Sequence, residues 1–423
     1  MKKLITFLLV AVLAVACCFS FTACSDNNKS FDKVKVGLIC LHGESSTYDK
    51  NFIDAFKAAC ANKQVESIIK VDIAESTACY DAAADLVDQG CNLIFADSFG
   101  HEDHIIKAAN EFRGVQFFHA TGTKAHTENL TNYHNAFASI YEGRYLAGIA
   151  GGMKLKAMIE ANQIKDNQKD ANGNIKVGYV GAWTYAEVIS GFTSWFLGVR
   201  SVVPNVVMDV QFTGSWYDEA AEKSAAELLI NRGCALISQH ADSMGAPTAC
   251  ETAGVPNVSY NGSTAASCPN TFIVSSRINW QPYYEYIIDS VKNNKIVELD
   301  WAQGLGQTWG SGSVALTDLG AAAAAGTKEA IDAAIAGFKA GTLKVFDLSK
   351  FTVGGNVLAD DFKANVNGTD DYVDENGIFV GVADTEVIKV TENGIKYFAE
   401  SEFRSAPYFD LQIDGITYLN TKF

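Results

Sequence analysis

Residues 93–122 read LIFADSFGHEDHIIKAANEFRGVQFFHATG, and this stretch decides the fold. Two short apolar runs, 93–96 and 115–119, flank a segment, 103–112, whose apolar residues recur at helical spacing. Buried parallel strands read as short apolar runs, and the connection between two of them is usually a helix. The stretch therefore predicts one strand–helix–strand unit of a parallel sheet.

The same alternation continues on both sides of this unit. Further strands are expected at 34–40, 65–73, 176–181, 206–212, 234–238, 255–259 and 272–275. Further helices are expected at 49–62, 80–89, 141–156, 186–199, 218–231, 244–253 and 282–293. Because the cycle restarts after the helix at 141–156, the sequence predicts an α/β protein with two doubly wound parallel sheets.

The first 33 residues predict a leader and a tether. A basic start and an apolar run end at the small-residue site FTAC, 21–24, which is typical of a lipoprotein signal peptide over 1–23 with lipid on Cys24. The run could also span a membrane, which needs about 20 apolar residues. The polar residues that follow directly, in the segment 24–33, favour the tether instead.

Charge and cysteine content exclude several classes of protein. The formal net charge of −16 disfavours nucleic acid and anionic lipid surfaces as partners. Seven cysteines follow the leader: Cys40, Cys60, Cys79, Cys91, Cys234, Cys250 and Cys268. This odd number, without a CxxC pair, argues against a complete disulfide framework and a zinc ribbon. One bridge, Cys250–Cys268, stays open.

Aromatic residues recur where the predicted strands end, which is where open parallel sheets bind ligands. They are Tyr48, Phe99, Trp183, Trp216, Tyr260 and Trp280. A flat apolar ligand between aromatic faces, with amides, hydroxyls and carboxylates at its edges, would need such a set. The alternative for each single aromatic is that it covers the core at a strand end.

Catalytic and metal sites are weaker alternatives. Ser98 and His101 could form a nucleophilic pair, but the chain has no G-x-S-x-G elbow and no obvious orienting acid. His101 and His104 stand three residues apart, yet they begin a predicted helix and are more simply polar cap residues.

Four phrases, at 93–100, 115–122, 141–150 (YEGRYLAGIA) and 279–284 (NWQPYY), resemble the basic membrane protein (BMP) family of purine nucleoside receptor-like lipoproteins. The resemblance runs from about 34 to 316. It implies a two-lobe periplasmic-binding-protein type I fold with a hinge, and a lipid-anchored, extracytoplasmic binding protein of an ABC importer. The implied partners are a purine base or nucleoside and the permease subunits, with no cofactor, metal or catalysis.

The resemblance also implies a division into lobes. Lobe 1 is expected at 34–138 plus 277–297, and lobe 2 at 139–276 plus 298–345. The remainder, 346–423, has Gly-Asn and Asn-Gly pairs that favour hairpins, so it is expected to be a β-rich C-terminal extension.

The expected ligand-binding residues combine the family phrases with the strand ends. They are Tyr48, Asp49, Ser98, Phe99, Gly100, Trp183, Trp216, Asp218, Gln239, His240, Asp242, Asn261 and Trp280. Family members often carry a Tyr-Asp-Ser-Asp-like phrase where this chain has Tyr260-Asn261-Gly262-Ser263. Because carboxylates make the stronger hydrogen bonds to hydroxyls, their loss favours a purine base over a nucleoside.

Two other functions stay open. A surface sensor could hand its ligand to a signalling receptor, and a nucleoside-processing hydrolase could use the polar strand ends. Neither has a sequence motif of its own in this chain.

Overall fold

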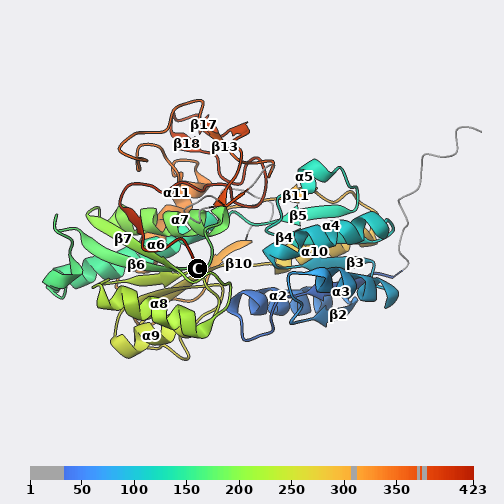
Figure 1. Ribbon diagram of the computed structural model, residues 1–423, viewed down its shortest axis with the longest axis horizontal. Helices are drawn as coiled ribbons and strands as arrows, with labels where there is room; N and C mark the ends of the chain where they lie inside the picture. Colours follow the sequence, from blue (N-terminus) through green and yellow to red (C-terminus); the bar gives the residue numbers. More distant parts are fainter. Residues whose placement is uncertain (1–32, 306–311, 369–371, 374–378) are drawn as a thin grey trace, which may run out of the picture.

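The computed structural model describes residues 33–305, 312–368, 372–373 and 379–423. The predicted leader and the lipid site at Cys24 lie outside the described residues. The chain forms two α/β lobes side by side, and its C-terminal part lies over the second lobe (Figure 1). The predicted α/β class with doubly wound parallel sheets is confirmed.

The first lobe is built on a six-stranded sheet whose pairings are all parallel. In sheet order the strands are β11 (Asp300–Trp301), β5 (Tyr133–Ala136), β4 (Gln116–Ala120), β3 (Leu93–Ala96), β1 (Lys35–Ile39) and β2 (Glu66–Lys70). Helices α2 (Thr47–Lys63) and α10 (Gln281–Lys292) cover one face. Helices α3 (Thr77–Asp88) and α4 (Glu102–Glu111) cover the other face, and short α5 (Ala125–Glu128) precedes β5.

The second lobe repeats this plan on a seven-stranded sheet. In sheet order the strands are β12 (Val314–Leu316), β10 (Phe272–Ile278), β9 (Asn257–Tyr260), β8 (Ile237–Gln239), β6 (Ile175–Gly181), β7 (Val206–Phe212) and β19 (Ile416–Tyr418). Helices α6 (Ile140–Glu160), α7 (Ala186–Val202) and α11 (Thr327–Lys339) belong to the core of one face. Helices α8 (Glu219–Asn231) and α9 (Gly245–Ala253) cover the other.

Both sheets share one strand order, and this places the site. The runs β2-β1-β3-β4-β5 in the first sheet and β7-β6-β8-β9-β10 in the second each follow the order 2-1-3-4-5 of doubly wound sheets. In that order, ligands bind at the switch point, outside the carboxyl ends of the first and third strands. The two switch points are therefore β1/β3 and β6/β8.

Segments that pass between the lobes lie beside one another. Phe137 N donates to Trp301 O at 2.9 Å, and Ser139 N donates to Gln303 O at 2.9 Å. Asn279 N donates to Ser313 O at 2.8 Å, which ties the passage after β10 to the segment before β12. These backbone bonds hold the passages together where the chain leaves one sheet for the other.

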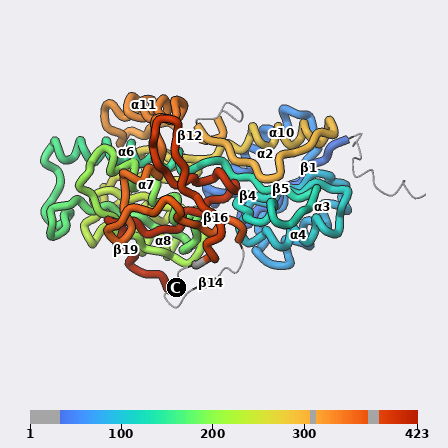
Figure 2. The backbone as a smooth tube through the Cα atoms, turned by 90° about the horizontal axis from the view of Figure 1, so that it is seen from above, coloured from blue at the N-terminus to red at the C-terminus, as the bar shows by residue number. Residues whose placement is uncertain are grey.

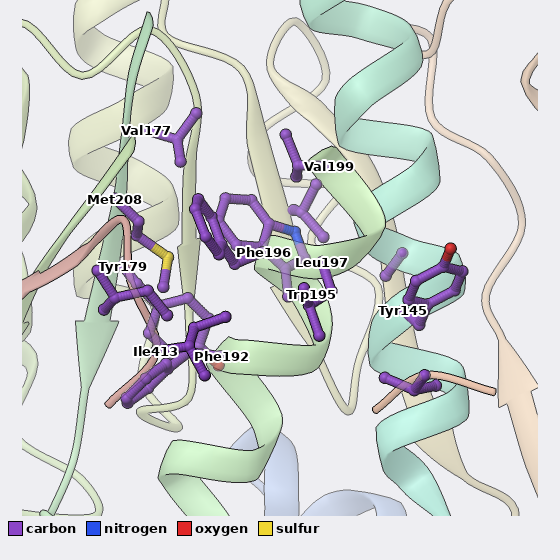
Figure 3. Packing of buried hydrophobic residues seen from close by; sticks show 14 of the residues in the cluster. Tyr145, Val177, Tyr179, Phe192, Trp195, Phe196, Leu197, Val199, Met208 and Ile413 are labelled. Atoms are coloured by element: carbon purple, nitrogen blue, oxygen red, sulfur yellow. The ribbon is translucent and has the colours of Figure 1, made fainter. Parts of the chain in front are cut away.

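Helices α6 and α7 cross unusually closely in the core of the second lobe (Figure 3). A Cβ atom on Gly148 would clash with the carbonyl oxygen of Trp195, and one on Gly198 would clash with that of Tyr145. The absence of side chains at both positions therefore lets the two backbones touch. Trp195 and its neighbours on α7 then fill the space against the sheet.

The C-terminal part of the chain is joined to the second lobe. Its strands include the pairs β13 (Lys363–Ala364) with β16 (Thr385–Glu386), β14 (Tyr372–Val373) with β15 (Phe379–Val380), and β17 (Ile388–Val390) with β18 (Lys396–Phe398). Strand β19 pairs in parallel with β7, and Ile413 packs with the buried side chains of α7 (Figure 3). Seen from above, this part lies over the second lobe and extends to where the lobes meet (Figure 2).

The Cys250–Cys268 bridge left open by the sequence does not form. All seven cysteines of the described residues are free and buried. Burial raises the pKa of the Cys268 thiol to about 11 and that of Cys250 further. Because disulfide formation proceeds through a thiolate, these protonated thiols are poorly placed to react.

Candidate functional site

A pocket lies between the two lobes, at the switch point of each sheet. Its empty volume is about 350 Å³. The first lobe supplies Leu41, His42, Tyr48, Asp49, Ser98, Phe99 and Thr121. The second lobe supplies Glu187, Trp216, His240 and Asp242.

Asp49 is the fixed anionic group on the first lobe. Its Oδ1 accepts from His42 N at 2.8 Å, and its Oδ2 accepts from the Ser46 hydroxyl at 2.6 Å. Burial alone would raise the pKa of this carboxyl, but the hydrogen bonds from His42 and Ser46 outweigh burial and lower it. Ser46 also caps α2 by accepting from Asp49 N, so the helix start and the carboxylate hold each other in place.

Tyr48 and Phe99 give the first lobe its aromatic faces. The Tyr48 hydroxyl donates to Asp97 O at 2.7 Å, and its ring lies 4.8 Å from that of Phe52. Phe99 stacks on Tyr185 of the second lobe at 5.0 Å between ring centroids. The rings are therefore held by neighbours rather than free to turn.

Trp216 and Asp242 face the pocket from the second lobe. Asp242 N donates to Trp216 O at 3.1 Å, which ties the two loops after β7 and β8 together. Burial, with the nearby Asp49, raises the pKa of the Asp242 carboxyl well above its usual range. Asp242 therefore tends to keep its proton, whereas Asp49 tends to be ionised.

His240 is held between a cation and an anion. Arg144 Nη2 lies 3.0 Å from His240 Nδ1, and His240 Nε2 lies 3.3 Å from Glu187 Oε1. Burial lowers the pKa of His240, although the adjacent Glu187 acts in the opposite direction. The imidazole is therefore neutral at neutral pH.

The lobes touch around the pocket. Thr47 N donates to Asp242 O at 3.0 Å, and Asn51 Nδ2 donates to Ile278 O at 2.7 Å. The rings of His42 and Tyr217 lie 5.3 Å apart. Since these contacts join the lobes around a narrow space, the structure is a closed arrangement.

Seven of the expected site residues line this pocket, and the other six lie elsewhere. The seven are Tyr48, Asp49, Ser98, Phe99, Trp216, His240 and Asp242. Gly100 N donates to Glu75, Gln239 Oε1 accepts from Asn257, and Asn261 Nδ2 reaches Asp242 Oδ1 at 3.4 Å.

The remaining three have contacts in the cores or at a helix end. Trp280 is buried and stacks on Phe52 at 4.5 Å. Trp183 packs against Tyr185 and Phe423. Asp218 is exposed and caps α8.

Four pocket residues were not among those expected: Leu41, His42, Thr121 and Glu187. Thr121 follows β4 directly and His42 stands three residues after the end of β1, so their position at strand ends was a usable signal. Glu187 stands in the first turn of α7, where acids are common because they interact favourably with the helix dipole. Its sequence position therefore gave no indication that it lines the pocket.

The alternative catalytic and metal sites find little support. The Ser98 hydroxyl donates to Glu75 at 2.6 Å, while His101 Nε2 lies 2.9 Å from Ile73 O. Burial lowers the pKa of His101 to about 4. The side chains of Ser98 and His101 therefore have separate partners, and no hydrogen bond between these two side chains is present among the described residues.

One group of possible metal ligands lies beneath the pocket. Atoms of Cys40, Asp49 and Asp97 lie within 4.8 Å of one another. Burial raises the pKa of both the Cys40 thiol and the Asp97 carboxyl well above their usual ranges. Since metals bind the thiolate and the carboxylate, two of these three groups are poor ligands as they stand.

Solved two-lobed solute-binding proteins share this fold. The ABC transporter solute-binding protein of Conexibacter woesei matches with a TM-score of 0.59 at 17% identity, over 74% of this chain and 98% of that one. A solute-binding protein of Aeropyrum pernix matches with a TM-score of 0.60 at 14% identity, over 74% and 93%. These likenesses confirm the type I periplasmic-binding-protein fold.

Residues 42–305 match the model of the Bmp family, described as ABC transporter substrate-binding proteins, PnrA-like. The chain belongs to this family, so it is a solute-binding protein and not an enzyme. Its partners are accordingly a solute and the permease of an ABC transporter. No helix of the described residues is long and apolar enough to cross a membrane.

Two relatives carry names that state a ligand. The purine-binding protein of Brucella abortus is 29% identical over 256 residues, 60% of this chain and 67% of that protein. A Haloferax volcanii protein named as an ABC transporter glucose-binding protein is 31% identical over 200 residues. That second match covers 47% of this chain and less than half, 46%, of the relative.

Proposed function

We propose that this chain is a lipid-anchored, extracytoplasmic receptor that binds a purine base between its lobes for an ABC importer. The observation that carries the proposal is the pocket itself, which Tyr48 and Phe99 of one lobe and Trp216 of the other line together. Aromatic faces on both sides suit a flat ring, and ionisable side chains at the edges suit its nitrogens. The Brucella relative's name is consistent with this ligand class.

Anchoring and movement complete the proposal. The FTAC site at 21–24 would place the lipid on Cys24, and 24–33 would be the tether. Lobe 1 (34–138 plus 277–297) and lobe 2 (139–276 plus 298–345) would move about the passages between the sheets, with the bounds adjusted so that β11 belongs to lobe 1 and the end of β10 to lobe 2. Because the closed pocket is narrow, a ring enters only when the lobes part, and closure then buries it.

A free base is favoured over a nucleoside by the loop after β9. Asn261 stands where relatives often carry an acid, and its amide is already directed to Asp242. The neutral amide would bind sugar hydroxyls less strongly than a carboxylate. A monosaccharide is the second candidate ligand, and only the name of the Haloferax relative favours it.

Titration calorimetry tests the ligand class. Purine bases, nucleosides and glucose are titrated into the parent protein and into Trp216→Ala. Loss of one stacking face should weaken purine binding roughly 5- to 150-fold, since base–aromatic stacking is worth about 1–3 kcal/mol. Tyr80→Ala, which removes an aromatic of α3 outside the pocket lining, should leave the affinity unchanged.

Two results would contradict the proposal. If the parent protein binds glucose and no purine, the ligand class is wrong. If Trp216→Ala folds normally and binds the purine as tightly as the parent does, the aromatic faces are not the binding surface.

A further inference from the structure

We infer that the linked side chains Arg144, His240 and Glu187 select for a purine that carries an exocyclic amino group. The inference rests on the proposed purine-binding function and adds to it the group on the ring that is recognised. Glu187 would accept the hydrogen bond from the amino group. Arg144 and His240 would act behind it as positioning residues.

Arg144 fixes the first link. It projects from α6, is 1% exposed, and its guanidinium lies 3.3 Å over the Tyr260 ring. Nη1 donates to Gln239 O at 3.2 Å, and Nη2 points to His240 Nδ1 at 3.0 Å. Because a guanidinium can only donate, His240 Nδ1 must accept, and the proton of the neutral ring is on Nε2.

The tautomer of His240 fixes the second link. With its proton on Nε2, the imidazole directs this N–H group toward Glu187 Oε1, which lies 3.3 Å from Nε2. The rings of Trp216 and Tyr260 lie 6.2 Å and 5.0 Å from the imidazole, so the ring has packed neighbours on more than one side. His240 therefore holds one carboxylate oxygen of Glu187 in a defined direction.

Glu187 is the link that meets the ligand. Its side chain is 9% exposed and lines the pocket, and an ionised carboxylate accepts hydrogen bonds without donating any. After receiving His240 Nε2–H, it still has lone pairs for a second donor. A buried acceptor left unpaired is costly, so the pocket should favour rings with a donor there.

Asp242 would supply the hydrogen-bond donor that complements the acceptor on Glu187. It lines the same pocket, and burial raises the pKa of its carboxyl well above the usual range, which favours the protonated form that can donate a hydrogen bond. One acceptor beside one donor matches an amino group beside a ring nitrogen, which is the edge that an amino-purine presents. Unsubstituted purine has only the acceptors N1 and N3 on its six-membered ring and so leaves Glu187 without a second donor there, whereas the N1–H group of hypoxanthine can still donate, which makes adenine and purine the sharper pair.

Matched pairs of bases provide the test. Adenine differs from purine, and guanine from hypoxanthine, by a single amino group. In at least one pair, the amino base should bind the parent protein tenfold or more tightly than its partner, as measured by calorimetry. Glu187→Gln should reduce that ratio to about one, because His240 will hold the amide oxygen and leave the amide N–H₂ facing the ligand.

Variants of His240 test the positioning role. His240→Gln keeps an N–H donor toward Glu187 and should retain most of the amino preference. His240→Leu removes the donor and should lose most of it, with circular dichroism and thermal unfolding confirming that each variant is folded. A change in overall affinity alone, with the preference unaltered in both variants, would show that His240 is merely structural.

The outcomes separate the two proposals. If the parent binds purines but both ratios stay below threefold, or the ratio survives Glu187→Gln, the inference is overturned and the proposed function stands. If the parent binds no purine at all, the proposed function falls and this inference falls with it.

Discussion

Asp218 begins α8, and its side chain accepts a hydrogen bond from Ala221 N at 2.9 Å. Its own backbone N donates to Glu222 Oε1 at 3.0 Å. Asp218→Ala should therefore lower the free energy of unfolding by about 1 kcal/mol, the usual value of an N-cap, with purine affinity nearly unchanged. Urea denaturation and calorimetry measure the two effects.

Asp218→Ser is the control for this residue, because serine also caps helices and should retain the stability. The opposite pattern would contradict the capping role. If Asp218→Ala binds the purine tenfold more weakly and unfolds at the same urea concentration, the carboxylate touches the ligand.

The local sequence predicts some pocket residues well and others not at all. Tyr48 and Trp216 could be predicted as pocket residues because each follows a strand of its lobe, Tyr48 in the first turn of α2 and Trp216 in the loop after β7. Trp280 follows β10 in the same way, yet it is buried against Phe52. Since an aromatic at a strand end can face a ligand or cover a core, only the packing distinguishes them. Glu187 carries no such signal, because acids are common in first helical turns.

The crossing of α6 and α7 depends on two glycines that have no room for a methyl group. Gly148→Ala would gain about 1 kcal/mol of helix propensity but drive a Cβ into the backbone of α7. Because a backbone cannot turn aside as a side chain can, we expect a net loss of at least ~2 kcal/mol in the free energy of unfolding. Thermal and urea unfolding measure it.

Gly114→Ala is the matched control, because an added Cβ there has no atom within 4 Å. It should change stability by no more than about 0.5 kcal/mol. If Gly148→Ala is as stable as the parent, α6 and α7 can move apart with no loss in the free energy of unfolding, and the prediction is wrong.

Long elements were predictable and short edge strands were not. The helices α2 and α7, each of 17 residues, show helical spacing over several turns. Strands β11 and β19 have only two and three residues. Their partners β5 and β7 stand far away in the chain, so pairing across the fold, rather than local pattern, creates them.

At the scale of the whole molecule, the C-terminal part is joined differently to the two lobes. Toward the second lobe it buries apolar side chains, among them Phe346 and Phe409, which stack at 4.1 Å in that core. Toward the first lobe its contacts include polar ones, such as Ser405 N to Asp300 Oδ1 at 3.0 Å. Apolar burial is the larger source of stability, so this part should move with the second lobe when the cleft opens.

Glu400 holds this C-terminal part together and should make the stability of the whole protein depend on pH. It is 1% exposed, and its Oε2 accepts from Tyr408 N at 3.2 Å and Phe409 N at 3.0 Å. Burial raises the pKa of its carboxyl to about 7, although these hydrogen bonds oppose the shift. The folded protein therefore binds this proton more tightly than the unfolded chain, whose glutamates titrate near ~4.3.

The direction of the pH dependence of stability follows from this difference between the folded and unfolded pKa of Glu400. Stability from Glu400 is fully present below pH ~4.3 and is lost as the pH rises to about 7, by on the order of 3 kcal/mol. Glu400→Gln keeps an acceptor for the two backbone N–H groups and cannot titrate. Relative to the parent, the variant should therefore gain stability from pH 4.5 to about pH 7, and the difference should level off above that pH. Burial lowers the pKa of His101 and His134 to about 4, so they act in the opposite direction, but equally in both proteins. Urea unfolding across this pH range measures the difference in free energy of unfolding between the parent and Glu400→Gln. If the two proteins have parallel stability profiles, Glu400 is not the source of the pH dependence.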